Sequence, residues 1–195
     1  MMFAGVIANG PDRELHFART VRSQYSPSVL GRSISDLRYW PQWFFSLDQA
    51  VVSEGQTEPG PLHAGENLTL RMDPKKGESK RFLLGVKVLE YVPDRLIHLQ
   101  IIRDTKNRLT RLFDRLEWSV EIIPEGPEAP GGPNETGTLI RGTATAHTSH
   151  WRSRLFGQLA GDILMNQVFY PDLIRLGETA DPTAHPSPGL DPNAF

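Results

Sequence analysis

The chain has 195 residues, of which 38% are hydrophobic and 23% are charged, and its formal net charge at pH 7 is −2. This length and composition favour one globular domain with a sizeable core. The small net charge gives no overall field that would attract nucleic acid or an anionic membrane surface. The chain contains no cysteine, which excludes disulfides, zinc–thiolate sites and a cysteine nucleophile.

No export signal or membrane span is visible in the sequence. The segment from Met1 to Pro11 has a short apolar run with no basic residue before it, unlike a signal peptide. No apolar stretch approaches the ~20 residues that a membrane span needs. We therefore expect a cytoplasmic protein that does not insert stably into a membrane.

Proline and glycine divide the chain into one central domain and two flanking segments. We expect a single domain over 14–178, preceded by a loose leader at 1–12. The segment 179–195 carries four prolines and is predicted to be a disordered tail. Two Pro- and Gly-rich stretches, 56–66 and 124–137, are predicted to be loops inside the domain.

Alternation of apolar and polar residues predicts strands with one buried and one solvated face. In the clearest case, the even positions from Leu112 to Ile122 are apolar except for Asp114. The segment 104–108 between two such runs is predicted to be a hairpin turn. Long strands are expected at 82–92, 95–103, 112–122 and 138–148, and shorter ones at 14–23, 48–54 and 67–73. Small inner residues in the 138–148 strand predict that another element packs closely there.

Helical patterns occur in two regions. The first begins at Pro27 after a plausible N-cap, Ser26, and breaks near Tyr39 to Pro41. The second runs from Ser149 to about Leu176, and Pro171 is expected to kink it. Its apolar stripe comprises Phe156, Leu159, Ala160, Ile163, Tyr170 and Ile174. Glycines near this stripe, Gly157 and Gly161, indicate a close approach by another element.

This order of elements predicts an α+β helix-grip fold. We expect a curved antiparallel sheet of about seven strands wrapped around one long C-terminal helix, with two short helices after the first strand. A single sheet covered by a single helix must curve to bury both apolar surfaces. Such curvature commonly leaves a gap between sheet and helix, and that gap is the predicted ligand site.

Two stretches near the start of the domain resemble the opening of the SRPBCC superfamily. They are Val21 to Val29 and Ile34 to Phe44. The superfamily includes START-like lipid-binding domains, polyketide cyclases and the major birch-pollen allergen type. The matching positions of the opening motif are Asp36, Tyr39, Trp40, Pro41 and Trp43, and later matches are Gly85, Trp118 and Trp151.

The resemblance covers roughly residues 14–178 and implies the same helix-grip fold. It leaves function open, because the superfamily contains carriers, cyclases, ring-hydroxylase subunits and co-chaperone-like regulators. We expect a carrier or sensor of a lipid-, sterol- or polyketide-like molecule, because the inner faces are overwhelmingly apolar. A cyclase or dehydratase and a protein-interaction module are the alternatives.

Eight residues are predicted to line the cavity. They are Trp40, Trp43, His98, Asp114, Trp118, Ile163, Gln167 and Tyr170. Several have a structural alternative: the tryptophans can be core packing, and Asp114 can lie at a strand end, reaching solvent or pairing with Arg103. Gln167 can hydrogen-bond a ligand, or it can bond the sheet backbone or compensate for the carbonyl that Pro171 frees. Tyr170 lies on the same face, and its hydroxyl needs a partner if it is buried, in either a ligand-binding or a structural role.

No cofactor and no metal ion are expected. His147 and His150, with His98 as a third ligand, have no acidic residue at ligand spacing. No phosphate-binding glycine loop and no nucleophile elbow occur. The partner predicted is a hydrophobic small molecule, and neither its identity nor an oligomeric state can be predicted.

Overall fold

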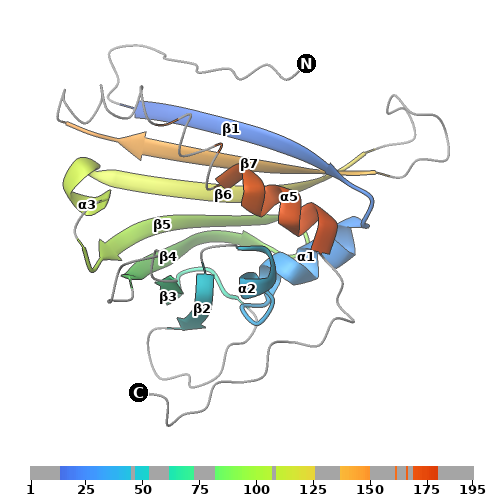
Figure 1. The fold of residues 1–195 in the computed structure, drawn as a ribbon, viewed down its shortest axis with the longest axis horizontal. Helices are drawn as coiled ribbons and strands as arrows, with labels where there is room; N and C mark the ends of the chain where they lie inside the picture. The colour runs from blue at the N-terminus through green and yellow to red at the C-terminus, as the bar shows by residue number, and fades with distance from the viewer. Residues whose placement is uncertain are drawn as a thin grey trace, which may run out of the picture.

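The computed structural model describes residues 14–44, 47–52, 62–72, 82–106, 109–125, 137–149, 161, 166 and 169–179. Its elements, in chain order, are β1 (Glu14–Ser23), α1 (Pro27–Ser35), α2 (Trp40–Trp43), β2 (Leu47–Val52), β3 (Asn67–Met72), β4 (Phe82–Val92), β5 (Leu96–Asp104), α3 (Leu109–Leu112), β6 (Arg115–Pro124), β7 (Thr138–His147) and α5 (Tyr170–Thr179) (Figure 1).

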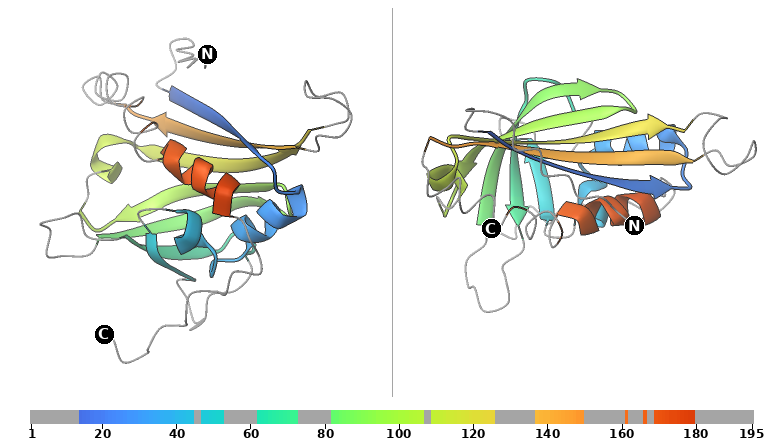
Figure 2. Two further views of the ribbon diagram at one scale, coloured as in Figure 1. Left: turned by 45° about the vertical axis from the view of Figure 1, so that its right-hand side comes forward. Right: turned by 90° about the horizontal axis from the view of Figure 1, so that it is seen from above.

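One antiparallel sheet contains all seven strands, in the order β1-β7-β6-β5-β4-β3-β2. Strands β2 to β6 each pair with the next strand in the chain, and β7 also pairs with β1. Helices α1, α2 and α5 lie on the same side of the curved sheet (Figures 1 and 2). The protein thus has the helix-grip α+β architecture that the sequence predicts, including two short helices after β1.

The alternation of side chains separates an inner face, toward α5, from an outer face. One inner row crosses four strands in register: Phe17 pairs with Ala144, Ala144 with Trp118, and Trp118 with Leu99. Successive residues of a strand point to opposite faces, so the flanking residues point outward. The register between β4 and β5 shifts twice, between Gly85 and Val86 and between Val88 and Glu90.

Small residues on β7 admit α5 close to the sheet, as the sequence predicts. A Cβ atom added to Gly142 would lie 2.4 Å from the ring of Phe169 and 2.6 Å from Leu173. The backbone also lies close to a side chain of the sheet at Gly161, where an added Cβ would lie 2.1 Å from the ring of Phe17. Gly157 lies outside the described residues.

Hydrogen bonds from the β1–α1 junction hold the C-terminal end of α5. The Ser23 hydroxyl donates to the Gly177 carbonyl at 2.8 Å, and the Tyr25 hydroxyl donates to the Glu178 carbonyl at 3.1 Å. The last carbonyls of a helix have no partner within the helix. These bonds therefore fix α5 against β1 at the end of the sheet where α1 lies.

Two details at element ends differ from the sequence predictions. Ser26 stands at the N-cap of α1, but its hydroxyl makes no capping bond and lies 3.1 Å from the Ser28 hydroxyl. The predicted hairpin turn at 104–108 is a longer connection that contains α3, so β6 begins at Arg115 rather than at residue 112. The carboxylate of Asp104 explains the added helical turn, as described below.

Parts of the C-terminal prediction lie outside the described residues. Residue 161 and residues 170–179 are α-helical, and Pro171 stands in the first described turn of α5. The kink at Pro171 stays a prediction, because 162–165, 167 and 168 are not described. The predicted leader at 1–12 lies outside the described residues, as does the predicted tail apart from Thr179, which closes α5. None of the described helices has the length and hydropathy to cross a membrane.

Candidate ligand-binding site

An aromatic cluster occupies the middle of the inner face. The ring of Trp118 on β6 lies 6.3 Å from that of Trp40, 5.5 Å from that of Phe44 and 5.8 Å from that of Phe169. Tilted and edge-on ring contacts at these distances are favourable. Trp118 thereby joins the sheet to α2, and through Phe169 to the residues that precede α5.

Trp40 and Trp43 are core residues that tie α2 to α1. Trp40 is fully buried, and its indole N–H donates to the Ile34 carbonyl at 2.9 Å. The Trp43 indole N–H donates to the Ser33 carbonyl at 3.1 Å. Both indoles therefore satisfy carbonyls at the end of α1. These contacts agree with the packing alternative for the two residues rather than with a cavity entrance.

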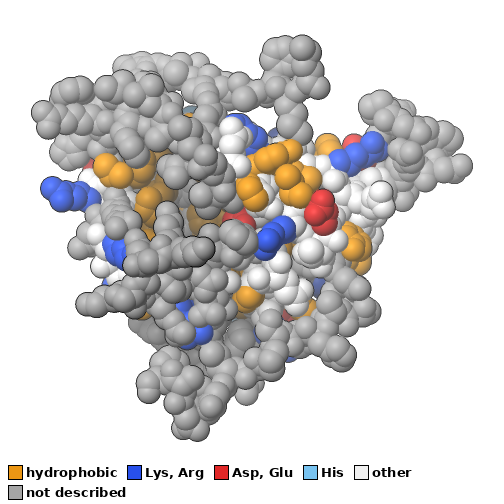
Figure 3. Space-filling model, viewed as in Figure 1, with side chains coloured by type: hydrophobic (Ala, Val, Ile, Leu, Met, Phe, Trp, Pro, Cys, Tyr) orange, Lys and Arg blue, Asp and Glu red, His pale blue; other side chains and the backbone are white. Residues whose placement is uncertain are grey.

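The exposure of the inner face changes along the strands. At the end near α1, inner side chains are fully buried, namely Ile97, Val120, Ile122 and Ile140. From the middle of the sheet toward α3 the burial is mixed: Leu15, Phe17 and Ala146 are buried, whereas four apolar side chains keep part of their exposure, namely Ile101, Leu116, Ala144 and Phe169. Hydrophobic side chains accordingly reach the surface near α3 in the space-filling view (Figure 3). Several apolar side chains of the inner face toward α3 are thus partly accessible, although others beside them are buried.

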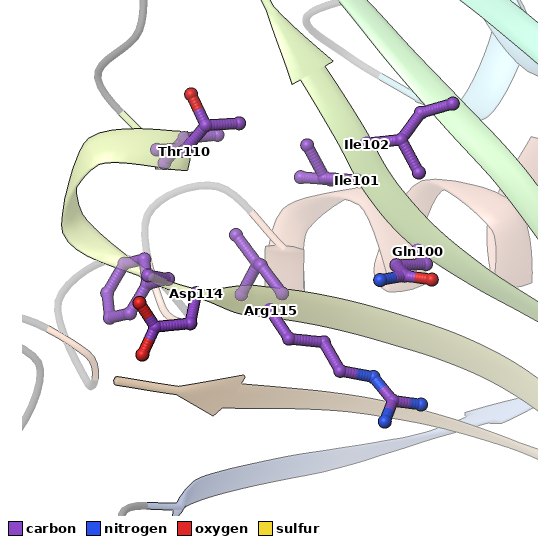
Figure 4. A pocket seen from close by; sticks show the side chains of 9 residues that line it. Gln100, Ile101, Ile102, Thr110, Asp114 and Arg115 are labelled. Carbon is purple, nitrogen blue, oxygen red and sulfur yellow. The ribbon is translucent and has the colours of Figure 1, made fainter. Parts of the chain in front are cut away.

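A hollow of about 290 Å³ lies between α3 and the adjoining ends of β5 and β6 (Figure 4). It is lined by Gln100, Ile101, Ile102, Leu109, Thr110, Phe113, Asp114, Arg115 and Leu116. Ile101 and Leu116 are paired neighbours on the inner face, so the hollow adjoins the partly exposed apolar end. Its volume is near the lower limit for ligand pockets, which is roughly 300 Å³.

Asp104, which the sequence analysis did not single out, positions α3. The side chain is 2% exposed and accepts backbone N–H bonds from Lys106 at 2.7 Å and from Leu109 at 2.6 Å. A carboxylate that binds the first free N–H groups of a helix stabilises its start. The sequence signal for this role is the aspartate itself at the end of a predicted strand, just before Thr105, because aspartate there is a typical start for a turn or a helix.

Asp114 lies at the surface rather than inside the sheet. Its backbone N–H donates to the His147 carbonyl at 2.9 Å, and its Oδ2 accepts the Ser149 N–H at 2.6 Å. The residue is exposed and precedes the first residue of β6. This is the strand-end alternative of the sequence analysis, with backbone groups of the β7 end as partners. Asp114 still lines the hollow, at its outer side.

His98 lies on the outer face, which corrects its place among the cavity candidates. Its neighbours Ile97 and Leu99 are fully buried on the inner face, so the imidazole points outward. There its Nε2 is 3.2 Å from a carboxylate oxygen of Glu117, and the other oxygen of Glu117 accepts a bond from Arg115. The network explains why Glu117 is buried on an otherwise solvated face.

His147 is also on the outer face, where its Nε2 lies 2.8 Å from a carboxylate oxygen of Glu14. The ring of His16 contacts the other Glu14 oxygen at 3.3 Å. No three His, Cys, Asp or Glu residues of the described chain are grouped in a way that would hold a metal ion. His150, the third histidine that the sequence analysis considered as a metal ligand, lies outside the described residues.

Among the predicted cavity residues in the C-terminal part of the chain, the structure describes only Tyr170. Ile163 and Gln167 lie outside the described residues, so their predicted positions in the cavity stay predictions. Tyr170 begins α5 and is half-buried. The buried face of α5 comprises Asp172, Leu173, Leu176 and Gly177. Asp172 is a buried carboxylate that the sequence analysis did not single out.

Comparison with known proteins finds likeness in structure and not in sequence. No family model and no curated protein sequence match the chain. Ginseng major latex-like protein 151 from Panax ginseng superposes with a TM-score of 0.61 at 6% identity, over 87% of this chain and 99% of that one.

Two further solved structures have the same fold. Norcoclaurine synthase from Thalictrum flavum, in complex with dopamine and hydroxybenzaldehyde, gives a TM-score of 0.59 at 9% identity, over 92% of this chain and 96% of that one. A START superfamily protein from Mycobacterium smegmatis gives a TM-score of 0.56 at 16% identity, over 85% of this chain and 99% of that one. The chain therefore has the helix-grip fold that these solved structures share, which is the fold that the resemblance of its opening motif implies.

Proposed function

We propose that the protein binds a hydrophobic small molecule between the inner face of the sheet and the C-terminal helix, as a carrier or sensor. The observation that carries this proposal is a group of partly exposed apolar side chains on the inner face toward α3. Ile101, Leu116 and Ala144 keep part of their surface accessible, beside buried residues such as Ala146. Apolar surface left accessible on an inner face is stabilised when an apolar ligand covers it, by roughly 25 cal/mol per Å².

The hollow beside α3 is the proposed mouth of this site. Ile101 and Leu116 belong both to its lining and to the apolar inner face. A ligand that entered there would pass these two side chains and reach Trp118, whose ring is 9% exposed. Lipid-, sterol- and polyketide-like molecules have the apolar surface that such walls recognise. The walls select for size and hydrophobicity rather than for one compound.

A cyclase or dehydratase activity is the less favoured function for this fold. General acid–base chemistry requires titratable groups within hydrogen-bond reach of the bound substrate. Two acid–base candidates, His98 and His147, lie on the outer face with Glu117 and Glu14. Two predicted cavity residues with an ionisable side chain, Asp114 at the mouth and Tyr170 on α5, are the other acid–base candidates. A neighbour named as a synthase has this fold, so the fold alone does not choose between binding and catalysis.

The proposal predicts that an apolar dye binds and that a larger side chain at the mouth blocks it. The uncharged dye N-phenyl-1-naphthylamine should become fluorescent with the wild-type protein. Leu116→Trp should weaken its binding at least about tenfold, because the added volume fills the space next to Ile101. The matched control is Leu139→Trp, on the outer face of β7, which should bind the dye as the wild type does.

Native mass spectrometry of gently purified protein provides the second measurement. A carrier should show an added mass that disappears under denaturing conditions. Protein that carries no added mass and binds no dye would overturn the proposal and favour a protein-interaction module with a filled interior. Equal dye binding by wild type and Leu116→Trp, with both folded by circular dichroism, would place the ligand elsewhere and also overturn it.

A further inference from the structure

The hollow lies where β5 and β6 separate. The last residues that pair these two strands are Ile101 and Leu116, whereas β5 continues beside β4 through Arg103 and Asp104. Ile102 is the extra residue at the register shift between β4 and β5, and it lines the hollow as an exposed apolar side chain. The hollow therefore opens between two strand ends, next to α3, and reaches both faces of the sheet.

The lining of the hollow is apolar toward the inner face and carries polar side chains toward the outer face. Ile101 and Leu116 belong to the inner face, and Leu109 and Phe113 complete the apolar side because both pack with core residues. The polar lining residues are Gln100, Thr110, Asp114 and Arg115. Those on the strands alternate with the inner residues and so point outward. A molecule that fills the hollow therefore meets apolar walls at one end and polar groups at the other.

The two charged lining residues already have partners. The Nε of Arg115 donates to a carboxylate oxygen of Glu117, and the Oδ2 of Asp114 accepts the Ser149 N–H at 2.6 Å. A ligand carboxylate would have to compete with Glu117 for Arg115 and would lie beside Asp114. A ligand ammonium group would meet the Arg115 guanidinium in the same way. Because like charges disfavour each other at such distances, the hollow favours neither a negative nor a positive ligand group.

Two uncharged lining side chains are available to a ligand. Within the described part of the chain, neither the amide of Gln100 nor the hydroxyl of Thr110 takes part in a hydrogen bond. Gln100 is half-buried on β5 and Thr110 is exposed on α3, and the two lie on different sides of Ile101 (Figure 4). An amide and a hydroxyl can each donate and accept. They therefore match a ligand group that also donates and accepts, such as a hydroxyl.

We propose that the hollow selects amphipathic ligands whose polar end is uncharged, and that it discriminates against long-chain carboxylates. The hydroxyl of such a ligand bonds Gln100 and Thr110, while its apolar part lies along the inner face. A few polar groups at an otherwise apolar site fix the orientation of a ligand in this way. The inference rests on the proposed function, because it assigns a ligand class and an orientation to the same site.

The test is displacement of N-phenyl-1-naphthylamine by two probes of equal chain length, 1-tetradecanol and tetradecanoate, at neutral pH. The wild type should bind 1-tetradecanol at least about tenfold more tightly than tetradecanoate. Comparison with variants removes the different solubilities of the two probes. Thr110→Val and Gln100→Leu should each weaken 1-tetradecanol binding about three- to tenfold through one lost hydrogen bond. Asp114→Asn should strengthen tetradecanoate binding several-fold, because it removes the neighbouring negative charge.

The matched control is Thr20→Val, which removes a hydroxyl from an exposed position of β1 and should bind both probes as the wild type does. Wild-type protein that binds the dye but prefers neither probe would overturn the inference and leave the proposed function in place. Unchanged 1-tetradecanol binding in both Thr110→Val and Gln100→Leu, or an equal loss in Thr20→Val, would also overturn it. Wild-type protein that binds neither dye nor 1-tetradecanol would overturn the proposed function and the inference together.

Discussion

Asp104 illustrates how one buried carboxylate shapes the mouth of the candidate site. Its two oxygens accept the backbone N–H groups of Lys106 and Leu109. We expect Asp104→Ala to lower the free energy of unfolding by about 1–2 kcal/mol, because both N–H groups lose their acceptor. Asp104→Asn keeps one acceptor oxygen and should lose about half as much. Urea unfolding measures both variants, and equal stability of Asp104→Ala and wild type would contradict this role.

Two glycines at the interface between α5 and the sheet differ in the space available for an added methyl group. We expect Gly142→Ala to destabilise the fold by about 1–3 kcal/mol, because its Cβ would overlap Phe169 and Leu173. Gly177→Ala is the matched control, since its Cβ would meet neighbours at 3.4 Å or more. Alanine also favours the helix by up to about 1 kcal/mol over glycine.

Thermal unfolding followed by circular dichroism distinguishes the two glycine variants. The expected result is a lower midpoint for Gly142→Ala and an unchanged or higher midpoint for Gly177→Ala. A tolerated Gly142→Ala would mean that α5 can move away from β7 at little cost. The inner face near α1 would then be kept closed by contacts other than the close packing of α5 on β7.

At the scale of the whole molecule, period-two patterns in the sequence were sufficient to predict the sheet. The even positions Trp118, Val120 and Ile122 point inward as the alternation requires, and single-sheet curvature follows from having few helices to cover it. The pattern fails where a strand ends. Asp114 was assigned to the inner face because the alternation was extended to residues that precede β6, whereas the chain between α3 and Arg115 is not yet a strand.

The mouth could not be predicted, because it depends on strand register and on the connection between β5 and β6. The hollow unites residues of β5, α3 and β6, and α3 begins at Leu109, whose backbone N–H donates to the carboxylate of Asp104. His98 was proposed by residue type, although the buried positions on both sides of it already direct its ring outward.

The site between sheet and helix joins the two layers of the molecule, so a ligand there should stabilise the whole fold. A ligand that binds only the native state stabilises it by about 2.7 kcal/mol when its free concentration is 100 times Kd. We therefore expect N-phenyl-1-naphthylamine at that excess to raise the unfolding midpoint of the wild type and of Leu139→Trp by several degrees. Leu116→Trp at the same dye concentration should gain at most about half of that stabilisation, because its binding is about tenfold weaker. A midpoint that rises equally in Leu116→Trp would show that the dye binds away from the mouth, and calorimetry with and without dye makes the comparison.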